Sequence, residues 1–184
     1  MSGKGFKDIL KSKKNLTFKS SEKLNSEKKE LLFRKAMDFH SKGNIQEAIK
    51  FYNLIINSDS TDQRALINLG AIYQQKGDFN KAIKIYENLI QLNPDASDAL
   101  SNYGLLLKDL GQLDKAESLL RKSISINPNS ANALCNFGGV LHELKKYNEA
   151  ELITRKSISI DPHNLHSYNN LAIILKDIDK VDQA

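Results

Sequence analysis

Hydrophobic residues recur along most of this chain at a fixed spacing. Written in rows of 34 residues from residue 29, the sequence has apolar residues at row positions 4, 7, 8 and 11, and again at 17, 20, 24 and 27 or 28. Each set follows the 3.6-residue period of an amphipathic helix. The rows are residues 29–62, 63–96, 97–130 and 131–164, with a partial row at 165–184. Each complete row therefore predicts two helices joined by a short turn, and the fixed period indicates a repeat architecture.

Residue size is also constant within columns of these rows. Small residues occupy position 8, as Ala36, Gly70, Gly104, Gly138 and Ala172. Position 20 holds only alanine, at Ala48, Ala82, Ala116, Ala150 and Ala184. Small residues at both positions let two helix backbones approach closely, while larger residues fill the space beside them. We therefore expect the two helices of each row to pack against each other.

Residues 121–128 and 155–162 are nearly identical, with the sequences RKSISINP and RKSISIDP. Alternating Ser and Ile are typical of a half-buried strand, in which successive side chains point to opposite faces. Both segments, however, follow two turns of helical pattern, and tertiary packing overrides a local strand preference. Each segment is therefore predicted to form the C-terminal turns of a second helix, which the following Pro128 or Pro162 prevents from continuing.

The second row carries residues that are typical of a known repeat family. They are Leu69, Gly70, Tyr73, Gly77, Phe79, Ala82, Tyr86 and Pro94. With them the chain resembles the tetratricopeptide repeat, over residues 29–184. The resemblance implies an all-α fold, a right-handed α-solenoid of helix pairs, with a concave groove that binds partner segments. Three departures are expected to loosen individual turns: Ser60 in place of proline, and Lys145 and Asp179 in place of the turn glycine.

An asparagine column lies on the polar side of the first helix of each row. Row positions 2, 6, 9 and 13 form a stripe opposite the apolar one, and in the tetratricopeptide family the corresponding stripe lines the groove. Position 6 is asparagine in four consecutive rows, at Asn68, Asn102, Asn136 and Asn170, whereas the first row has Arg34. Asparagine costs a helix about a few tenths of a kcal/mol relative to alanine. We therefore expect this column to contribute to binding or to packing.

Two interpretations of the asparagine column stay open. A carboxamide offers two N–H donors and an acceptor, so the column is suited to hold the backbone of an extended peptide. In this it resembles the inner ladder of the O-linked N-acetylglucosamine transferase family, whose solenoid guides substrate polypeptides to a separate catalytic domain. In the alternative interpretation, the carboxamides bond to neighbouring helices or to water within the stack.

Other polar side chains around the column, at positions 2, 12 and 13, complete the candidate peptide-binding site. They are Arg64, Lys108, Asp109, His142 and Glu143. Acidic residues at position 13 indicate a modest preference for partners with basic character. Position 5 lacks the paired cations of the carboxylate clamps that bind chaperone C-termini, so we do not expect a partner of that kind.

Charge and composition limit the other functions. The net charge of +5 comes from residues 1–30, which hold nine Lys against four acidic residues. Residues 1–28 are predicted to be a flexible basic leader, and the balanced remainder argues against nucleic-acid binding. The chain has no apolar run long enough for a membrane span and no signal peptide, so we expect a cytoplasmic protein. A single cysteine, Cys135, permits no internal disulfide.

The sequence contains no recognisable catalytic or cofactor motif. Cys135 and His142 lie seven residues apart on one predicted helix, too far for a catalytic pair. The cluster Asp161, His163 and His166 lacks the further ligands of a metal site. No enzyme activity, metal or cofactor is therefore predicted. Two functions stay open: a scaffold or adaptor that binds a protein or peptide segment, and the substrate-recognition arm of a larger, bacterial glycosyltransferase or sulfotransferase whose catalytic domain lies beyond residue 184.

Overall fold

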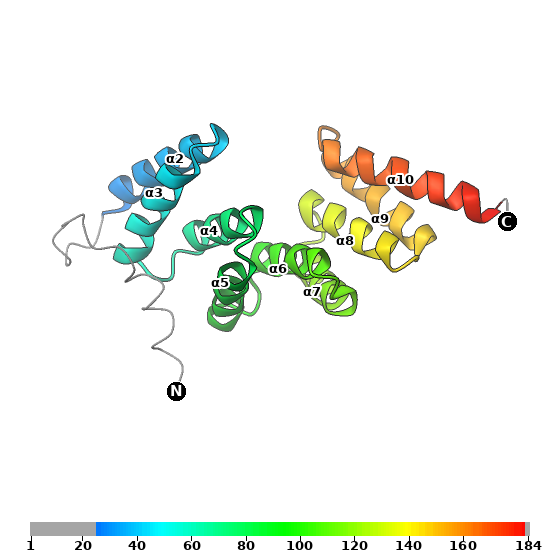
Figure 1. The fold of residues 1–184 in the computed structure, drawn as a ribbon, viewed down its shortest axis with the longest axis horizontal. Helices are drawn as coiled ribbons and strands as arrows, with labels where there is room; N and C mark the ends of the chain where they lie inside the picture. The colour runs from blue at the N-terminus through cyan, green and yellow to red at the C-terminus, as the bar shows by residue number, and fades with distance from the viewer. Residues whose placement is uncertain (1–24, 183–184) are drawn as a thin grey trace. The chain divides into compact units, whose positions relative to one another are not determined.

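The chain folds into paired α-helices, as the periodicity predicts. The computed structural model describes residues 25–182, and this part contains nine helices and no strand. The helices, labelled in Figure 1, are α2 (Ser26–Ser41), α3 (Ile45–Ser58), α4 (Gln63–Gln75), α5 (Phe79–Leu92), α6 (Ser97–Asp109), α7 (Leu113–Ile126), α8 (Ala131–Glu143), α9 (Tyr147–Ile160) and α10 (Leu165–Asp182). The predicted all-α solenoid is confirmed. Residues 1–24 of the predicted leader lie outside the described residues, and residues 26–28 belong to α2.

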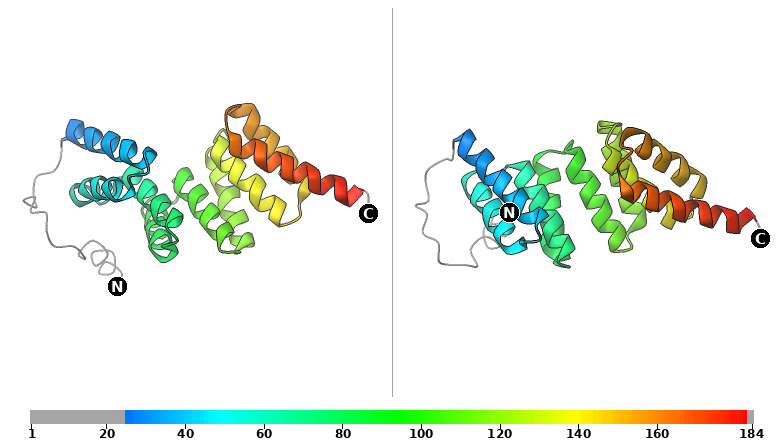
Figure 2. Two further views of the ribbon diagram at one scale, coloured as in Figure 1. Left: turned by 45° about the horizontal axis from the view of Figure 1, so that its top comes forward. Right: turned by 90° about the horizontal axis from the view of Figure 1, so that it is seen from above.

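Contacts between helices divide the chain into two compact units, which the sequence did not predict. The first unit extends to Leu89 and contains α2, α3, α4 and most of α5. The second unit begins at Ile90 and contains the end of α5 with α6 to α10. In the second unit α8, α9 and α10 contact one another, as Figures 1 and 2 show. Each unit is described separately below.

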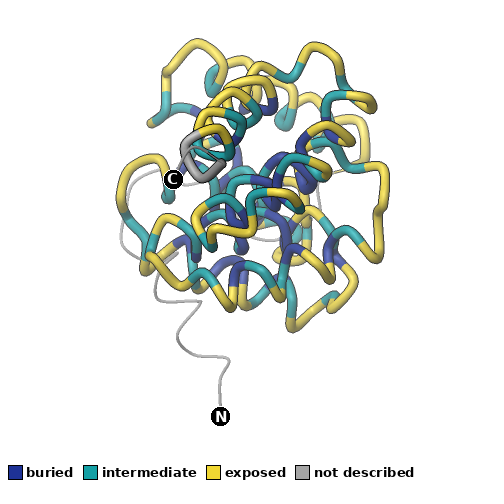
Figure 3. Tube along the Cα trace, turned by 90° about the vertical axis from the view of Figure 1, so that its right-hand side faces the viewer, coloured by how far each residue is buried: buried dark blue, intermediate teal, exposed yellow. Residues whose placement is uncertain are grey.

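The size columns explain how the two helices of a row pack. The position 20 residues Ala48, Ala82, Ala116 and Ala150 are completely buried. An added Cβ atom at Gly104 would lie 2.7 Å from Cγ of Leu120, and one at Gly70 would lie 2.8 Å from the ring of Tyr86. Glycine at position 8 therefore makes room for the large residue at position 24 of the same row. Figure 3 colours the Cα trace by burial, with buried residues in dark blue and exposed residues in yellow.

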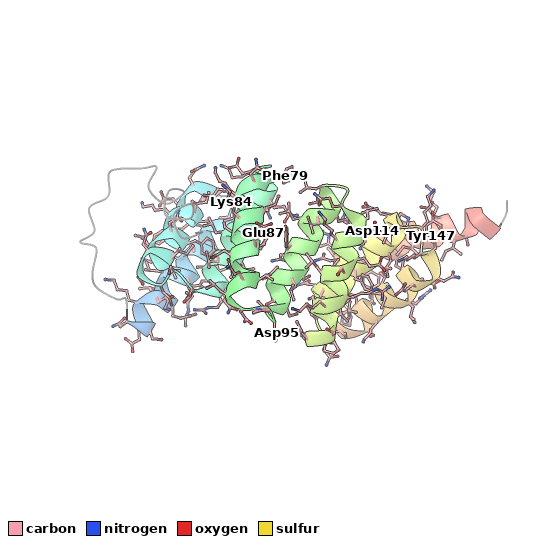
Figure 4. All side chains as sticks on the ribbon, turned by 90° about the horizontal axis from the view of Figure 1, so that it is seen from below. Phe79, Lys84, Glu87, Asp95, Asp114 and Tyr147 are labelled. Atoms are coloured by element: carbon pink, nitrogen blue, oxygen red, sulfur yellow. The ribbon has the colours of Figure 1, made fainter. Side chains whose placement is uncertain are left out.

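The turn within each row depends on one residue with positive φ. Gly43, Gly77 and Gly111 have φ angles of 75°, 74° and 71°, and Lys145 adopts 61° at the same position. The backbone bonds after Lys145 match those after Gly111: the next N–H donates to Leu141 at 2.9 Å in one row and to Leu107 at 2.8 Å in the other. Lysine therefore keeps the geometry of the glycine turns. Beyond each turn, position 17 begins the second helix, at Phe79 and Tyr147 in Figure 4.

Replacing Lys145 with glycine should stabilise the protein, because a left-handed φ costs a residue with a Cβ atom about 1 kcal/mol more than glycine. We expect the Lys145→Gly variant to unfold at higher denaturant concentration. The measurement is urea denaturation followed by circular dichroism. Lys145→Ala keeps the Cβ atom and serves as the control. Equal midpoints for the glycine and alanine variants would show that a Cβ atom at this positive φ costs no stability.

The turns between rows are held by an Asx residue at position 31. Its side-chain oxygen accepts a hydrogen bond from the N–H two residues later, at 3.1 Å for Asp59 and Thr61 and at 3.1 Å for Asn93 and Asp95. The same bond forms in the next two rows, from Asn127 and Asp161. Lys29 also donates to Asp59 at 2.7 Å, and this bond is the main reason that the pKa of Asp59 falls to about 2. Ser60, in place of proline, therefore lies within a turn that is held by the same local bond.

The partial last row differs from the others. The turn expected at Asp179 does not form, and α10 continues through this position to Asp182. The turn requires a left-handed conformation, which aspartate adopts less readily than glycine. The helical backbone therefore continues through this position. Among the described residues no second helix covers α10, and Leu165, Tyr168 and Ile173 are exposed by 75%, 45% and 51%.

The repeated RKSISI segments are helical, as predicted, and their serines explain part of the repetition. The first serine of each copy is completely buried and donates to the start of the first helix of its row: Ser123 to the Ser97 carbonyl at 2.9 Å, and Ser157 to the Ala131 carbonyl at 2.7 Å. The first serine thus links the end of one helix to the beginning of its partner.

None of the helices described for residues 25–182 is both long and apolar enough to cross a membrane.

Candidate functional site

A polar hollow lies on the second unit. It has a volume of about 390 Å³. Four of its lining residues belong to the predicted site, namely Asn102, Lys108, Asn136 and Asn170. The others are Leu105, Asn132, Cys135, Gly139, Asn164 and His166. Helices α6, α8 and α10, the first helices of three consecutive rows, supply all of these residues except Asn164, which directly precedes α10.

Two carboxamides of the column bond to the preceding row. Nδ2 of Asn136 donates to Oγ of Ser101 at 3.1 Å, and Nδ2 of Asn170 donates to the Cys135 carbonyl at 3.1 Å. Ser101 and Cys135 both occupy position 5, so each link joins position 6 of one row to position 5 of the preceding row. Nδ2 of Asn170 also lies 3.5 Å from the Cys135 sulfur. The side-chain oxygens of Asn136 and Asn170 have no hydrogen-bond partner within residues 25–182.

The other two asparagines of the column behave differently. Asn102 is half-buried at the hollow, and its side chain makes no hydrogen bond to the described part of the chain. Asn68 belongs to the first unit, where its Nδ2 donates to the Arg64 carbonyl of its own helix at 2.8 Å. The hollow therefore brings together three of the four predicted asparagines.

A second series of bonds follows the edge of the stripe, from position 12 of one row to position 13 of the next. Lys108 contacts Glu143 at 3.3 Å, and His142 contacts Asp177 at 2.8 Å. Lys108 also lies 3.7 Å from Asp109. The acidic residues of this edge thus face cationic or ionisable partners of the protein itself. Because a paired carboxylate attracts a basic partner less strongly, the geometry weakens the expected preference for basic partners.

Arg64, another predicted site residue, is engaged within the first unit. Its guanidinium lies 3.0 Å from a carboxylate oxygen of Glu30 and 4.4 Å from the ring centre of Phe33. The positive charge of Arg64 is thus stabilised by an ion pair and by contact with an aromatic face. Arg64 therefore contributes to the packing of α4 on α2, and it does not line the hollow of the second unit.

Comparison with family models identifies the repeat. Models described as tetratricopeptide repeat match residues 32–56, 73–136 and 131–164. The chain is a tetratricopeptide repeat (TPR) protein. TPR domains generally bind proteins or peptides, so the fold supports a general role in protein interaction. A comparison of the sequence with curated proteins gives no match.

Several solved structures have a similar fold. A thermophilic TPR protein of Thermus thermophilus has 18% identity and a TM-score of 0.73, with 84% of each chain covered. The pilF protein of Pseudomonas aeruginosa has 18% identity and a TM-score of 0.71, with 83% of this chain and 69% of that chain covered. MamA of Desulfovibrio magneticus has 18% identity and a TM-score of 0.63, with 82% and 85% covered. At these identities the likeness concerns the fold alone.

The hollow contains one cysteine, and its environment makes the thiol unreactive. Cys135 is 5% exposed, and burial raises the pKa of its thiol, which keeps the sulfur protonated and unreactive at neutral pH. Within the described part of this TPR chain, no three His, Cys, Asp or Glu side chains converge to hold a metal ion. TPR repeats are typically non-catalytic, and the absence of enzyme activity and of cofactors stays a prediction.

Sequence reasoning did not single out Asn164 and Gly139, which both line the hollow. Asn164 caps α10 by accepting from the Ser167 N–H at 3.3 Å, and its Nδ2 reaches the oxygen of Asn132 at 3.5 Å. An asparagine directly before a helix is a known capping signal, so this residue was detectable as a cap. Gly139 occupies position 9 of the TPR row, inside α8, where only the structure shows what surrounds it.

Proposed function

We propose that the second unit binds an extended peptide segment in the hollow and holds the peptide by its backbone. One observation carries the proposal: Asn102, Asn136 and Asn170, from three consecutive rows, line the same hollow. Their carboxamides can accept from a backbone N–H and donate to a backbone carbonyl. A partner held in this way is recognised largely without regard to its side chains.

The spacing of the three asparagines suits an extended chain. Packed helices lie about 8 to 10 Å apart, and an extended peptide advances about 3.3 Å per residue. Successive asparagines would therefore meet about every third residue of the bound segment. Asn136 and Asn170 each have an unpaired oxygen available for such contacts, and Asn136 also has a second N–H.

The links to the preceding row also support the packing interpretation for Asn136 and Asn170. The two roles are compatible, because a carboxamide that is held by one N–H keeps a fixed orientation for its other atoms. Asn102 separates the two interpretations most clearly. It makes no hydrogen bond within residues 25–182, so its packing role there is small.

Replacing Asn102 with alanine should weaken peptide binding by about 1 kcal/mol, which is about fivefold in Kd, because one hydrogen-bonding side chain is lost. The fold should tolerate the change, since alanine has the higher helix propensity. The measurement is fluorescence anisotropy with a library of unstructured peptides, combined with a thermal melt of the same variant.

The matched control is Asn148→Ala, an exposed asparagine on α9 outside the hollow. It should leave peptide binding unchanged. An Asn102→Ala variant that melts at a lower temperature and binds peptide with native affinity would contradict the proposal. In that case the column would serve packing alone.

The wider setting of this binding site stays a prediction. An adaptor and the recognition arm of a larger enzyme would use the same hollow in the same way, so the proposed contacts apply to both. The extent of the repeat array and a cytoplasmic location belong to the proposal as well.

A further inference from the structure

Position 9 of the polar stripe varies in size around the hollow. The first helices of the last three rows carry Leu105, Gly139 and Ile173 at this position. Leu105 and Gly139 line the hollow, and Ile173 is 51% exposed. Gly139 thus has no side chain at a position where the rows before and after it carry Leu105 and Ile173.

The packing of the protein does not require glycine at this position. At Gly104 an added Cβ atom would lie 2.7 Å from a side chain of the second helix, so glycine is needed for close packing. At Gly139 an added Cβ atom would meet only Nδ2 of Asn170, at an ordinary contact distance of 3.6 Å. Glycine inside a helix is nevertheless unfavourable relative to alanine. The space over Gly139 is thus open, and the helix is less stable for it.

We propose that Gly139 determines specificity in the hollow: its missing side chain opens a pocket that takes one small, uncharged polar side chain of the bound peptide, such as serine, threonine or asparagine. This inference rests on the proposed function. It adds a side-chain preference at one position to a site that otherwise holds the peptide backbone.

The polarity of the pocket follows from the groups around it. Nδ2 of Asn170 donates to the Cys135 carbonyl at 3.1 Å and lies 3.5 Å from the Cys135 sulfur, whereas the side-chain oxygens of Asn136 and Asn170 are unpaired within residues 25–182. A hydroxyl or a carboxamide N–H of the ligand can donate to either oxygen. A purely apolar side chain would leave both groups without a partner, which is costly in a desolvated site.

Charge and size exclude other side chains. The cation that lines the hollow, Lys108, is paired with Glu143 at 3.3 Å, so a charged ligand side chain would lose water without gaining a free counterion. Asn170 lies close by, at 3.6 Å from an added Cβ atom at Gly139, which limits the room for a large ring. A short polar side chain meets both conditions.

The test compares Gly139→Leu, which introduces the residue that row three has at this position, with the native protein. The probes are extended peptides that differ at one position only, which carries Ser, Thr, Asn, Val, Lys, Asp or Phe. We expect the native protein to bind the Ser, Thr and Asn peptides about tenfold more tightly than the others, and Gly139→Leu to lose this preference. Gly139→Leu should also melt a few degrees higher, because leucine favours the helix.

The control is Ser118→Ala, which raises helix propensity at an exposed position of α7 away from the hollow. It should keep both the affinity and the preference. If the native protein binds none of the peptides, the proposed function fails. If it binds them and Asn102→Ala weakens all of them, while Gly139→Leu leaves the preference unchanged, only the inference about Gly139 is overturned.

Discussion

Replacing Leu120 with alanine is expected to lower the free energy of unfolding of the second unit by about 2 to 5 kcal/mol, because a fully buried leucine leaves a cavity when it is truncated. Leu120 is completely buried beside Gly104 and belongs to the core that also contains Phe137 and Leu141. The measurement is urea denaturation, followed by hydrogen exchange of α6 and α7 to locate the loss.

The effect of replacing Gly104, which packs against Leu120, should depend on whether Leu120 is present. Gly104→Ala alone should destabilise the native protein by about 1 to 3 kcal/mol, because its Cβ atom would lie 2.7 Å from Cγ of Leu120. In the Leu120→Ala background the same change should stabilise by about 1 kcal/mol, since the obstruction is gone and alanine favours the helix. Gly139→Ala, where the added Cβ atom meets open space, is the control and should stabilise in both backgrounds. If Gly104→Ala had the same effect in both backgrounds, glycine at position 8 would not be needed to make room for Leu120.

This relation between positions 8 and 24 shows why much of the fold was predictable. The rows place Gly104 in a column of small residues and Leu120 in a column of mostly large residues. The structure brings these two residues into contact. The helix pairs, the position of the turns and the helical state of the RKSISI segments follow from the same period. These features depend on local sequence and on nearest neighbours, which a repeat pattern records directly.

The places where the structure departs from the repeat pattern have local physical causes. Lys145 adopts the left-handed conformation because the surrounding turn bonds hold it there, and no residue-type rule would place lysine at a φ of 61°. At Asp179 the reverse occurs, and the helix continues to Asp182 where the pattern predicts a turn. The division into two units, with its boundary inside α5, has no counterpart in a sequence whose rows are nearly equivalent.

The candidate site was predictable as a column and less so as a set of contacts. Three asparagines of the column line one hollow, but their links to position 5 depend on side-chain rotamers and on the identity of Ser101. The pairing of Lys108 with Glu143 joins residues 35 positions apart, so a pattern read within one row does not detect it. Gly139 was hidden for another reason: a missing side chain has meaning only when its surroundings are known.

The buried serine pair of the last rows provides the second large effect. Oγ of Ser157 donates to the Ala131 carbonyl at 2.7 Å and lies 2.8 Å from Oγ of Ser167, and both serines are completely buried. Because Ser157 gives its proton to the carbonyl, Ser167 is the donor between the two hydroxyls. Ser157→Ala should therefore lower the free energy of unfolding by about 1 to 2 kcal/mol, since a buried hydroxyl and a buried carbonyl each lose a bond.

Removing both hydroxyls should cost less than removing one. In the Ser157→Ala, Ser167→Ala double variant no buried hydroxyl is left without a partner, so we expect it to recover about half of the loss. Urea denaturation of the two single variants and the double variant measures the coupling. Ser159→Ala is the control, because Ser159 is exposed and bonds only to the Lys156 carbonyl of its own helix. Strictly additive losses from the two single variants would show that the two hydroxyls act independently, and the link from α9 to α10 would then rest on apolar packing.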